Sequence, residues 1–580
     1  MFSLVRRLKI GQSFTLAYLL LLLPARVISQ VASFDGLVLD LPYVESDGSI
    51  YATQLGFVED SGLAEFLLQS IEEVAASNNQ LHAKFSDGVL AIPQLEYLGN
   101  QYWVEMALLA DSNPPRFRLS SAFTLNADTT SEEVGSQYLI QNINVIDVAA
   151  EALLPAYSVL IADNRIQSVR PGELLPVPAN FPVVDGSDKY LIPGLWDTHV
   201  HVNSEEELAL FIIKGVTGIR QMYGAPDLRE YDWRAQIGTP DFVSPRLLVG
   251  STTLGGAGGS PGHIAVTDEE SGREQVRYFH EVGADFIKVY DGLTRDVYLA
   301  ILDEASKLGL PVAGHAPDAV SVSEISSLGQ ISIEHANGLN AETAIDYADI
   351  ILEMTARASS ENREVSWNDR LLAQERTYNE QDPAKQAALD QLLRDNGTFV
   401  VPTFVVSQTW SMLTNDAEEN ASLHEEFIDY VSPSTLAGWT ADPVVQSAPV
   451  AFRIFEVLLY SNRLQLIKRL HDAGVPIATG TDAGVAYVFY GFSMHDELQS
   501  MVDSGISEIQ SLKAATINAA ELVGMTDQLG TIDRGKLADL VILNANPLDD
   551  IANTEAIDAV IFNGQYRSRE VLDDLLEELK

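Results

Sequence analysis

Two histidines, His199 and His201, stand one residue apart at the end of the apolar stretch LIPGLWDTHVHV, residues 191–202. Alternate side chains of a β-strand point to the same face, so both imidazoles can reach one metal cation. A catalytic metal needs at least one more protein ligand and an open position for water. The chain downstream must therefore supply further ligands.

Four more polar residues of suitable type follow short apolar runs. Lys288 lies inside FIKVY, His315 ends VAGH, His335 ends SIEH and Asp482 ends ATGTD. The chain contains no cysteine, so every metal ligand must be nitrogen or oxygen. One histidine at a strand end is usually a structural residue, but ligand types at five strand ends predict a shared metal site.

Short apolar segments alternate with helix-length segments through the middle of the chain, which favours a parallel (β/α)8 TIM-like barrel. The segments predicted as strands are the opening stretch and 217–222, 246–249, 286–290, 312–315, 331–335, 399–406 and 477–482. Active sites of such barrels lie at the C-terminal strand ends. Two insertions, roughly 340–395 and 408–450, are expected to cover the barrel mouth as lids, and 507–525 is expected to be helical.

The barrel is predicted at 193–529, and alternating apolar residues flank it on both sides. We expect 136–192 and 530–570 to form one composite β-sandwich. An extra β-rich module is predicted at 30–135, interrupted by a helix at 63–75. His82 in this module is expected to be structural.

The first 29 residues have the pattern of a signal peptide: Arg6, Arg7 and Lys9, then an apolar core at 14–23, then VIS at 27–29. We expect a mature start near Gln30, no mature transmembrane helix, and a secreted, periplasmic protein, with Sec and twin-arginine export both open. The formal charge of −46 argues against attraction to nucleic acid or anionic membranes. Oligomeric state does not follow from the sequence.

Several motifs together resemble the amidohydrolase superfamily, close to its imidazolonepropionase-like and prolidase-like branch. The matching stretches are PGLWDTHVH (193–201), GADFIKVYDG (283–292), AGHA (313–316), SIEHANGL (332–339), GTDAG (480–484), GFSMHDEL (491–498) and LGTIDRGKLADLVIL (529–543). The resemblance covers about 136–568 and leaves the N-terminal module outside.

The resemblance implies a binuclear site holding two divalent metals, zinc by default, with manganese, cobalt or iron also compatible with these ligands. His199 and His201 would hold one metal with Asp482, and His315 and His335 the second. Lys288 would bridge them as a carbamate formed with carbon dioxide, because a bare ammonium beside two cations is disfavoured. The alternative is a lysine extending to the surface.

Around the metals, Asp482 would act as general base and then acid. Tyr290 shares a strand face with Lys288 and is a candidate to bind a substrate carbonyl, or else it packs the barrel top. His263 and His495 are candidate substrate contacts, with an exposed loop position as the alternative for His263. Asp197 is expected to orient a ligand.

The implied reaction is hydrolysis of a C–N bond in an amide, peptide or cyclic amide by metal-bound hydroxide, as in a dipeptidase, prolidase or N-acyl amino acid hydrolase. A lactonase, esterase or phosphotriesterase is the alternative within enzymes, because hydroxide attacks those centres too. A surface- or ligand-binding protein with a structural metal is the non-enzymatic alternative. The expected partner is a small molecule or short peptide, and no arginine in the sequence marks a carboxylate pocket.

Overall fold

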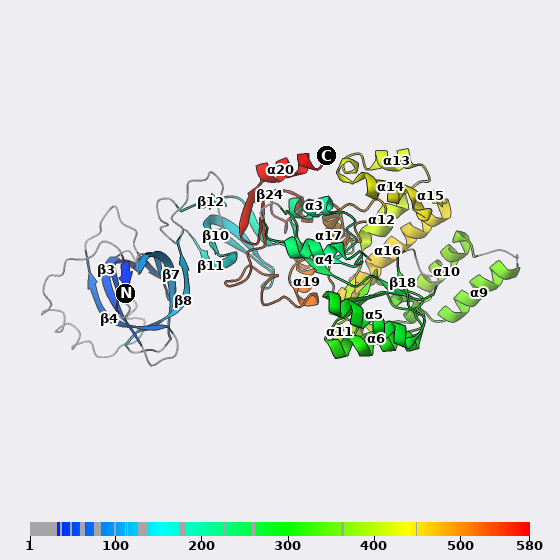
Figure 1. Cartoon of the computed structure of the whole chain (residues 1–580), viewed down its shortest axis with the longest axis horizontal. Coiled ribbons are helices and arrows are strands. Elements are labelled where there is room, and N and C mark those ends of the chain that lie inside the picture. Colours follow the sequence, from blue (N-terminus) through cyan, green and yellow to red (C-terminus); the bar gives the residue numbers. More distant parts are fainter. Residues whose placement is uncertain are drawn as a thin grey trace. The chain divides into compact units, whose positions relative to one another are not determined.

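The computed structural model describes residues 32–580 except 35–37, 47–48, 59–63, 75–82, 98–99, 111, 113, 126–136, 173–180, 226, 240–241, 258–261, 361–364 and 448. The predicted signal peptide and His82 lie outside these residues. The chain divides into two compact units, 1–143 with 155–187 and 533–535, and 144–154 with 188–532 and 536–580. Figure 1 follows the elements of both units by colour along the chain.

The first unit begins with an eight-stranded sheet of order β1-β2-β3-β4-β8-β7-β6-β5, with further pairings β1–β6 and β2–β5. Its strands are β1 (Ala32–Phe34), β2 (Val38–Ser46), β3 (Ser49–Phe57), β4 (Glu65–Glu73), β5 (Ala83–Ser86), β6 (Val89–Tyr97), β7 (Asn100–Leu108) and β8 (Arg116–Thr124). Buried side chains including Leu39, Leu55, Leu90 and Phe117 form its core. The predicted β-rich module is therefore present.

The helix predicted at 63–75 is wrong, because this stretch contains strand β4. Its backbone pairs antiparallel with β3 from Phe66 to Glu73 and with β8 at Glu65 to Leu67. These ladder bonds lie between segments distant in sequence, and they override the helical preference of Leu, Gln and Glu. The first unit also contains β11 (Arg165–Pro171), paired with β10 (Ala152–Ala162), and β12 (Val183–Asp185), paired with β9 (Tyr138–Asp147).

In the second unit, strands from both flanks of the barrel form one sheet. β13 (Tyr190–Pro193) pairs parallel with Asn144 and Val145 of β9 and antiparallel with β23 (Leu540–Leu543). β24 (Ile557–Phe562) and β25 (Gln565–Ser568) continue the sheet. The expected pairing of residues before and after the barrel is thus observed.

The middle of the second unit is TIM-barrel-like, with parallel strands that are each followed by helical segments. The regular strands are β14 (Leu195–Val200), β15 (Val216–Gln221), β16 (Arg246–Val249), β19 (Ile287–Val289), β20 (Val312–Gly314), β21 (Ser332–Glu334) and β22 (Phe399–Val401). Short β17 (Leu254–Gly255) and β18 (Ile264–Ala265) pair beside β19. Parallel bridges Gly250–Phe286, Val400–Ile477 and Val200–Ala483 connect the remaining neighbours, so residues 477–483 occupy the eighth position without forming a regular strand.

Helices cover the barrel strands and bury a largely aliphatic core against them. They are α3 (Leu208–Ile213), α4 (Arg229–Gln236), α5 (Glu269–Val282), α6 (Arg295–Leu308), α7 (Val322–Ser327), α16 (Val450–Asp472), α17 (Ser493–Asp503), α18 (Glu508–Ala514) and α19 (Ile517–Leu522). α20 (Arg569–Glu578) ends the chain. Within the described ranges, no helix is both long and apolar enough to cross a membrane.

Both insertions are helical, as expected. The first contains α8 (Leu339–Thr343), α9 (Tyr347–Ser360), α10 (Trp367–Asn379) and α11 (Pro383–Asn396). The second contains α13 (Ala417–Leu423), α14 (Pro433–Ala441) and α15 (Pro443–Ser447). The strand predicted at 399–406 is shorter than expected, because Thr403 has a left-handed backbone (φ 47°) and α12 (Phe404–Met412) begins after it.

Candidate metal centre

Three of the predicted ligands converge closely at the C-terminal end of the barrel. Single ligand atoms of His199, His201 and Asp482 all lie within 4.8 Å of one another. Nε2 of His201 lies 2.8 Å and Nε2 of His199 lies 3.3 Å from Oδ1 of Asp482. His199 stands in β14, whereas Asp482 has a left-handed backbone (φ 63°) that turns the chain at the end of the eighth segment.

The hydrogen bonds of these groups fit a cation. Nε2 of His199 and Oδ1 of Asp482 are buried and lack an aligned hydrogen-bond partner among the described atoms. Nδ1 of His199 contacts Oε2 of Glu334 at 2.7 Å, so it carries the proton and Nε2 presents a lone pair. Burial opposes ionisation of Asp482, but the adjacent His199 and His335 hold its pKa well below the ordinary value. The anionic oxygen of Asp482 thus faces Nε2 of His199, as in a metal-ligand set.

His335 and His315 extend this cluster. The His335 ring centroid lies 4.7 Å from that of His199 and 4.8 Å from that of His315. Nδ1 of His335 is 2.7 Å from Oγ1 of Thr403, and Nδ1 of His315 is 3.2 Å from Oδ1 of Asp291. Burial lowers the pKa of both imidazoles, which keeps them neutral. Each therefore has Nε2 available as a ligand.

Lys288 lies in β19 with only 2% of its surface exposed. Burial lowers its pKa to about 8, and it is close enough to Glu334 and Asp482 for both carboxylates to act on its charge. The alternative of a lysine extending to the surface is therefore wrong. A buried amine with a lowered pKa is more often in the neutral form that reacts with carbon dioxide.

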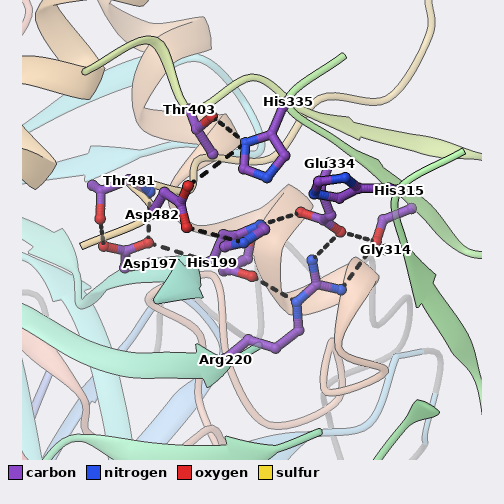
Figure 2. A network of polar contacts seen from close by, with 12 residues as sticks. Asp197, His199, Arg220, Gly314, His315, Glu334, His335, Thr403, Thr481 and Asp482 are labelled. Atoms are coloured by element: carbon purple, nitrogen blue, oxygen red, sulfur yellow. Dashed lines mark hydrogen bonds and ion pairs between the residues drawn. The ribbon is translucent and has the colours of Figure 1, made fainter. Parts of the chain in front are cut away.

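Glu334 and Arg220 support the centre, although their roles were not recognised from the sequence. Arg220 donates to Oε1 of Glu334 at 2.8 Å, to the Thr198 carbonyl at 2.6 Å and to Oγ of Ser332 at 3.1 Å (Figure 2). Burial opposes ionisation of Glu334, but Arg220 and His199 hold its pKa well below the ordinary value. The pair fixes the ring of His199. The sequence signal for this pair is Arg220 itself, a charged residue inside the run VTGIRQ that forms a buried strand.

Asp197 acts on the loop that carries Asp482 rather than on a histidine ring. Its Oδ1 accepts from the backbone N–H of Thr481 at 2.9 Å, and its Oδ2 accepts from Oγ1 of Thr481 at 2.5 Å (Figure 2). It also accepts from the backbone N–H of His199 at 3.3 Å. Asp197 thus ties the first barrel strand to the eighth segment beside both candidate ligands.

Of the candidate substrate contacts, two lie beside the cluster. The Tyr290 ring centroid is 4.0 Å from that of His315 and 4.5 Å from that of His263. Burial raises the pKa of Tyr290 to about 12, so its hydroxyl remains a donor. Nδ1 of His263 is buried without a hydrogen-bond partner among the described atoms. The side chain of His263 is half-buried, so the alternative of an exposed loop histidine is not supported.

His495 is not brought to the site. It is buried in α17, with Nδ1 2.9 Å from Oγ1 of Thr554 and Nε2 3.1 Å from the Lys214 carbonyl. Both ring nitrogens are engaged by the protein, and burial lowers its pKa to about 3. The assignment of His495 as a substrate contact is corrected: the ring joins a helix to its neighbours.

A cavity of about 580 Å³ opens beside His335. Its wall includes residues 316–322, 336–338 and 340–342, part of α10, and Arg463 of α16. The first insertion therefore contributes residues to the wall of the cavity that adjoins His335.

Residues 290–567 match the model of the Amidohydrolase family. The chain contains an amidohydrolase family domain. Imidazolonepropionase of Thermoplasma acidophilum is 34% identical over 95 residues, which is 16% of this chain and 22% of that protein. Dihydroorotase of Thermus aquaticus is 32% identical over 192 residues, 31% of this chain and 41% of that protein. The chain thus spans between about a fifth and two fifths of these relatives, which belong to a family of hydrolases acting on C–N bonds.

Solved structures support the fold. The bottromycin amidohydrolase superposes with a TM-score of 0.61 and 24% identity over 77% of this chain and 90% of that chain. A Xaa-Pro dipeptidase with bound methionine gives a TM-score of 0.53 and 21% identity over 74% and 100%. At these identities the likeness establishes a shared fold.

Proposed function

We propose that this chain is a secreted, periplasmic binuclear-metal amidohydrolase that cleaves a C–N bond in a dipeptide or an N-acyl amino acid. The convergence of His199, His201 and Asp482 on one point, with buried ligand atoms that lack aligned partners, carries the proposal. The family match and the fold shared with a Xaa-Pro dipeptidase support the choice of substrate class.

The residues would hold two divalent ions, zinc by default: His199, His201 and Asp482 on one side, His315 and His335 on the other. When bound, such ions lower the pKa of water and polarise a carbonyl group. We also propose that Lys288 is carboxylated, since its neutral amine can add to carbon dioxide and lose a proton. The burial of Lys288 beside this cluster supports that assignment.

Three side chains of the protein would perform the proton transfer, the oxyanion stabilisation and the positioning of His199. Asp482 accepts a proton from the attacking water and delivers it to the leaving nitrogen. The Tyr290 hydroxyl, protonated at neutral pH, donates a hydrogen bond to the developing oxyanion. Glu334, held by Arg220, keeps the proton on Nδ1 of His199.

Metal analysis with an activity screen tests the proposal. The exported protein, loaded with zinc in bicarbonate buffer, should contain two ions per chain and hydrolyse members of a panel of dipeptides and N-acyl amino acids. His199→Ala should lose metal and activity, whereas His471→Ala, near the C-terminal end of α16, should retain both. One ion and an unmodified Lys288 would contradict the binuclear site, turnover of lactones or esters alone would favour the other hydrolase class, and ligand binding without turnover after metal loading would favour a binding protein.

A further inference from the structure

Arg463 places a cationic side chain in the wall of the cavity beside the metal cluster. It lies near the middle of α16, is 7% exposed, and lines the same 580 Å³ space as His335. No motif in the sequence marks Arg463, because it occurs in a helix far from all of the motifs.

Its guanidinium lacks an anionic partner. Nη1 donates to the Thr403 carbonyl at 3.0 Å and approaches Oγ of Ser407 at 3.4 Å. No carboxylate among the described residues lies within ion-pair distance of it, whereas buried Arg220 is paired with Glu334. A buried charge with only neutral partners is costly, and an anion brought by a ligand would relieve that cost.

Besides Asp482 of the predicted metal cluster, two carboxyl groups, Glu456 and Glu497, act on Arg463 from a greater distance. Burial raises the pKa of Glu456 to about 7 and that of Glu497 to about 8. Near neutral pH both groups are protonated for much of the time, so they neutralise Arg463 only in part.

The position of Arg463 suits recognition of one end of a substrate. Thr403 connects it to the cluster, because the Thr403 carbonyl accepts from Arg463. The Thr403 hydroxyl contacts Nδ1 of His335 (Figure 2). Tyr378 and Asn340, whose side chains hydrogen-bond each other, line the same cavity. Two acids line the same cavity, the exposed Asp318 and the half-buried Glu342, which accepts from the backbone N–H of Ser323 at 3.1 Å. Arg463 is therefore the buried charge of this wall, where an anion is favoured.

We propose that Arg463 binds the carboxylate of the substrate, which restricts the substrates to amides carrying a free carboxylate, such as N-acyl amino acids and dipeptides with a free C-terminus. This proposal rests on the proposed function for the reaction itself. The binding of the carboxylate is a separate property that can be measured without turnover.

Binding of matched probes tests the proposal directly. The zinc-loaded protein is titrated calorimetrically with L-proline, L-leucine and L-phenylalanine and with their amides. A charged hydrogen-bonded pair predicts that at least one amino acid binds 10-fold or more tightly than its amide. Arg463→Met should remove this preference, and Arg463→Lys should retain part of it. The control Arg469→Met, on the same helix but paired with Asp390, should leave it unchanged.

Equal binding of acid and amide by the unmodified protein, or no binding of any of the acids, overturns the proposal whether or not the protein turns over a substrate. The proposal is also overturned if Arg463→Met weakens the binding of the amino acids and of their amides equally. In that case Arg463 would serve only to hold Thr403 in place. If circular dichroism shows that Arg463→Met does not fold, the comparison of acid and amide binding by the wild type and by Arg463→Lys still tests the proposal. An active enzyme that cleaves N-acyl amino acids and their amides equally well refutes the carboxylate site while leaving the proposed hydrolysis intact.

Discussion

Glu497 offers a quantitative test of how burial sets the energetics around the barrel. Its side chain is fully buried in α17, where Oε2 accepts from the backbone N–H of Val405 at 3.1 Å and Oε1 has no hydrogen-bond partner among the described atoms. Burial raises its pKa from 4.5 to about 8. The folded protein therefore keeps a proton that the unfolded chain releases near pH 4.5, and stability falls as pH rises from about 4.5 to about 8.

Glu497→Gln removes this titration while keeping an oxygen for the Val405 N–H group. At about 1.4 kcal/mol per pKa unit, the free energy of unfolding of the wild type should fall relative to Glu497→Gln by roughly 3 to 4 kcal/mol between pH 5 and pH 8. Urea denaturation of both proteins at pH 5, 6.5 and 8 measures this difference, and subtracting the two cancels the titration of all other groups. Parallel pH profiles would falsify the reasoning. If the free energy of unfolding of the wild type instead rose relative to that of Glu497→Gln between pH 5 and pH 8, the start of α12 would stabilise the carboxylate more than burial disfavours it.

Three further predictions concern the candidate metal centre. Glu334→Gln leaves Arg220 buried without its counter-charge, so unfolding free energy should fall by about 3 kcal/mol and metal affinity about 10-fold or more, measured by denaturation and metal titration; unchanged metal affinity would contradict the role assigned to Glu334. Dialysis against a chelator should abolish hydrolysis and lower the melting temperature, and zinc should restore both; a metal-free protein with full activity would refute a metal-dependent reaction. Tyr290→Phe should lower kcat about 100-fold with little change in KM; a change in KM alone would assign Tyr290 to packing.

The clustering of the candidate metal ligands was predictable, because each sits where an apolar strand ends and parallel strands bring such ends together. This reasoning needs only local pattern and barrel geometry, and it placed His199, His201 and Asp482 correctly in one cluster. It also placed His335 and His315 beside them.

Other features depend on partners far away in sequence. The segment 65–73 reads as a helix locally, and only its pairing with β3 and β8 makes it a strand. The importance of Glu334 depends on Arg220, and that of Arg463 on a cavity formed by an insertion. For His495 the prediction of a substrate contact was wrong for the same reason. Its position after the eighth segment suggested a free ring, but Thr554 and the Lys214 carbonyl, both distant in sequence, bind its two ring nitrogens.

The closing contacts of the barrel also set an order of events during synthesis. The bridge Val200–Ala483 and the Asp197–Thr481 hydrogen bonds join the first barrel strand to the eighth segment. The flanking sheet adds β23, which pairs with β13. A ribosome must therefore deliver nearly the whole barrel before His199 meets Asp482. The nascent chain consequently carries its first histidines without a complete cation site, and a product truncated before Asp482 lacks that site however well its earlier strands pair.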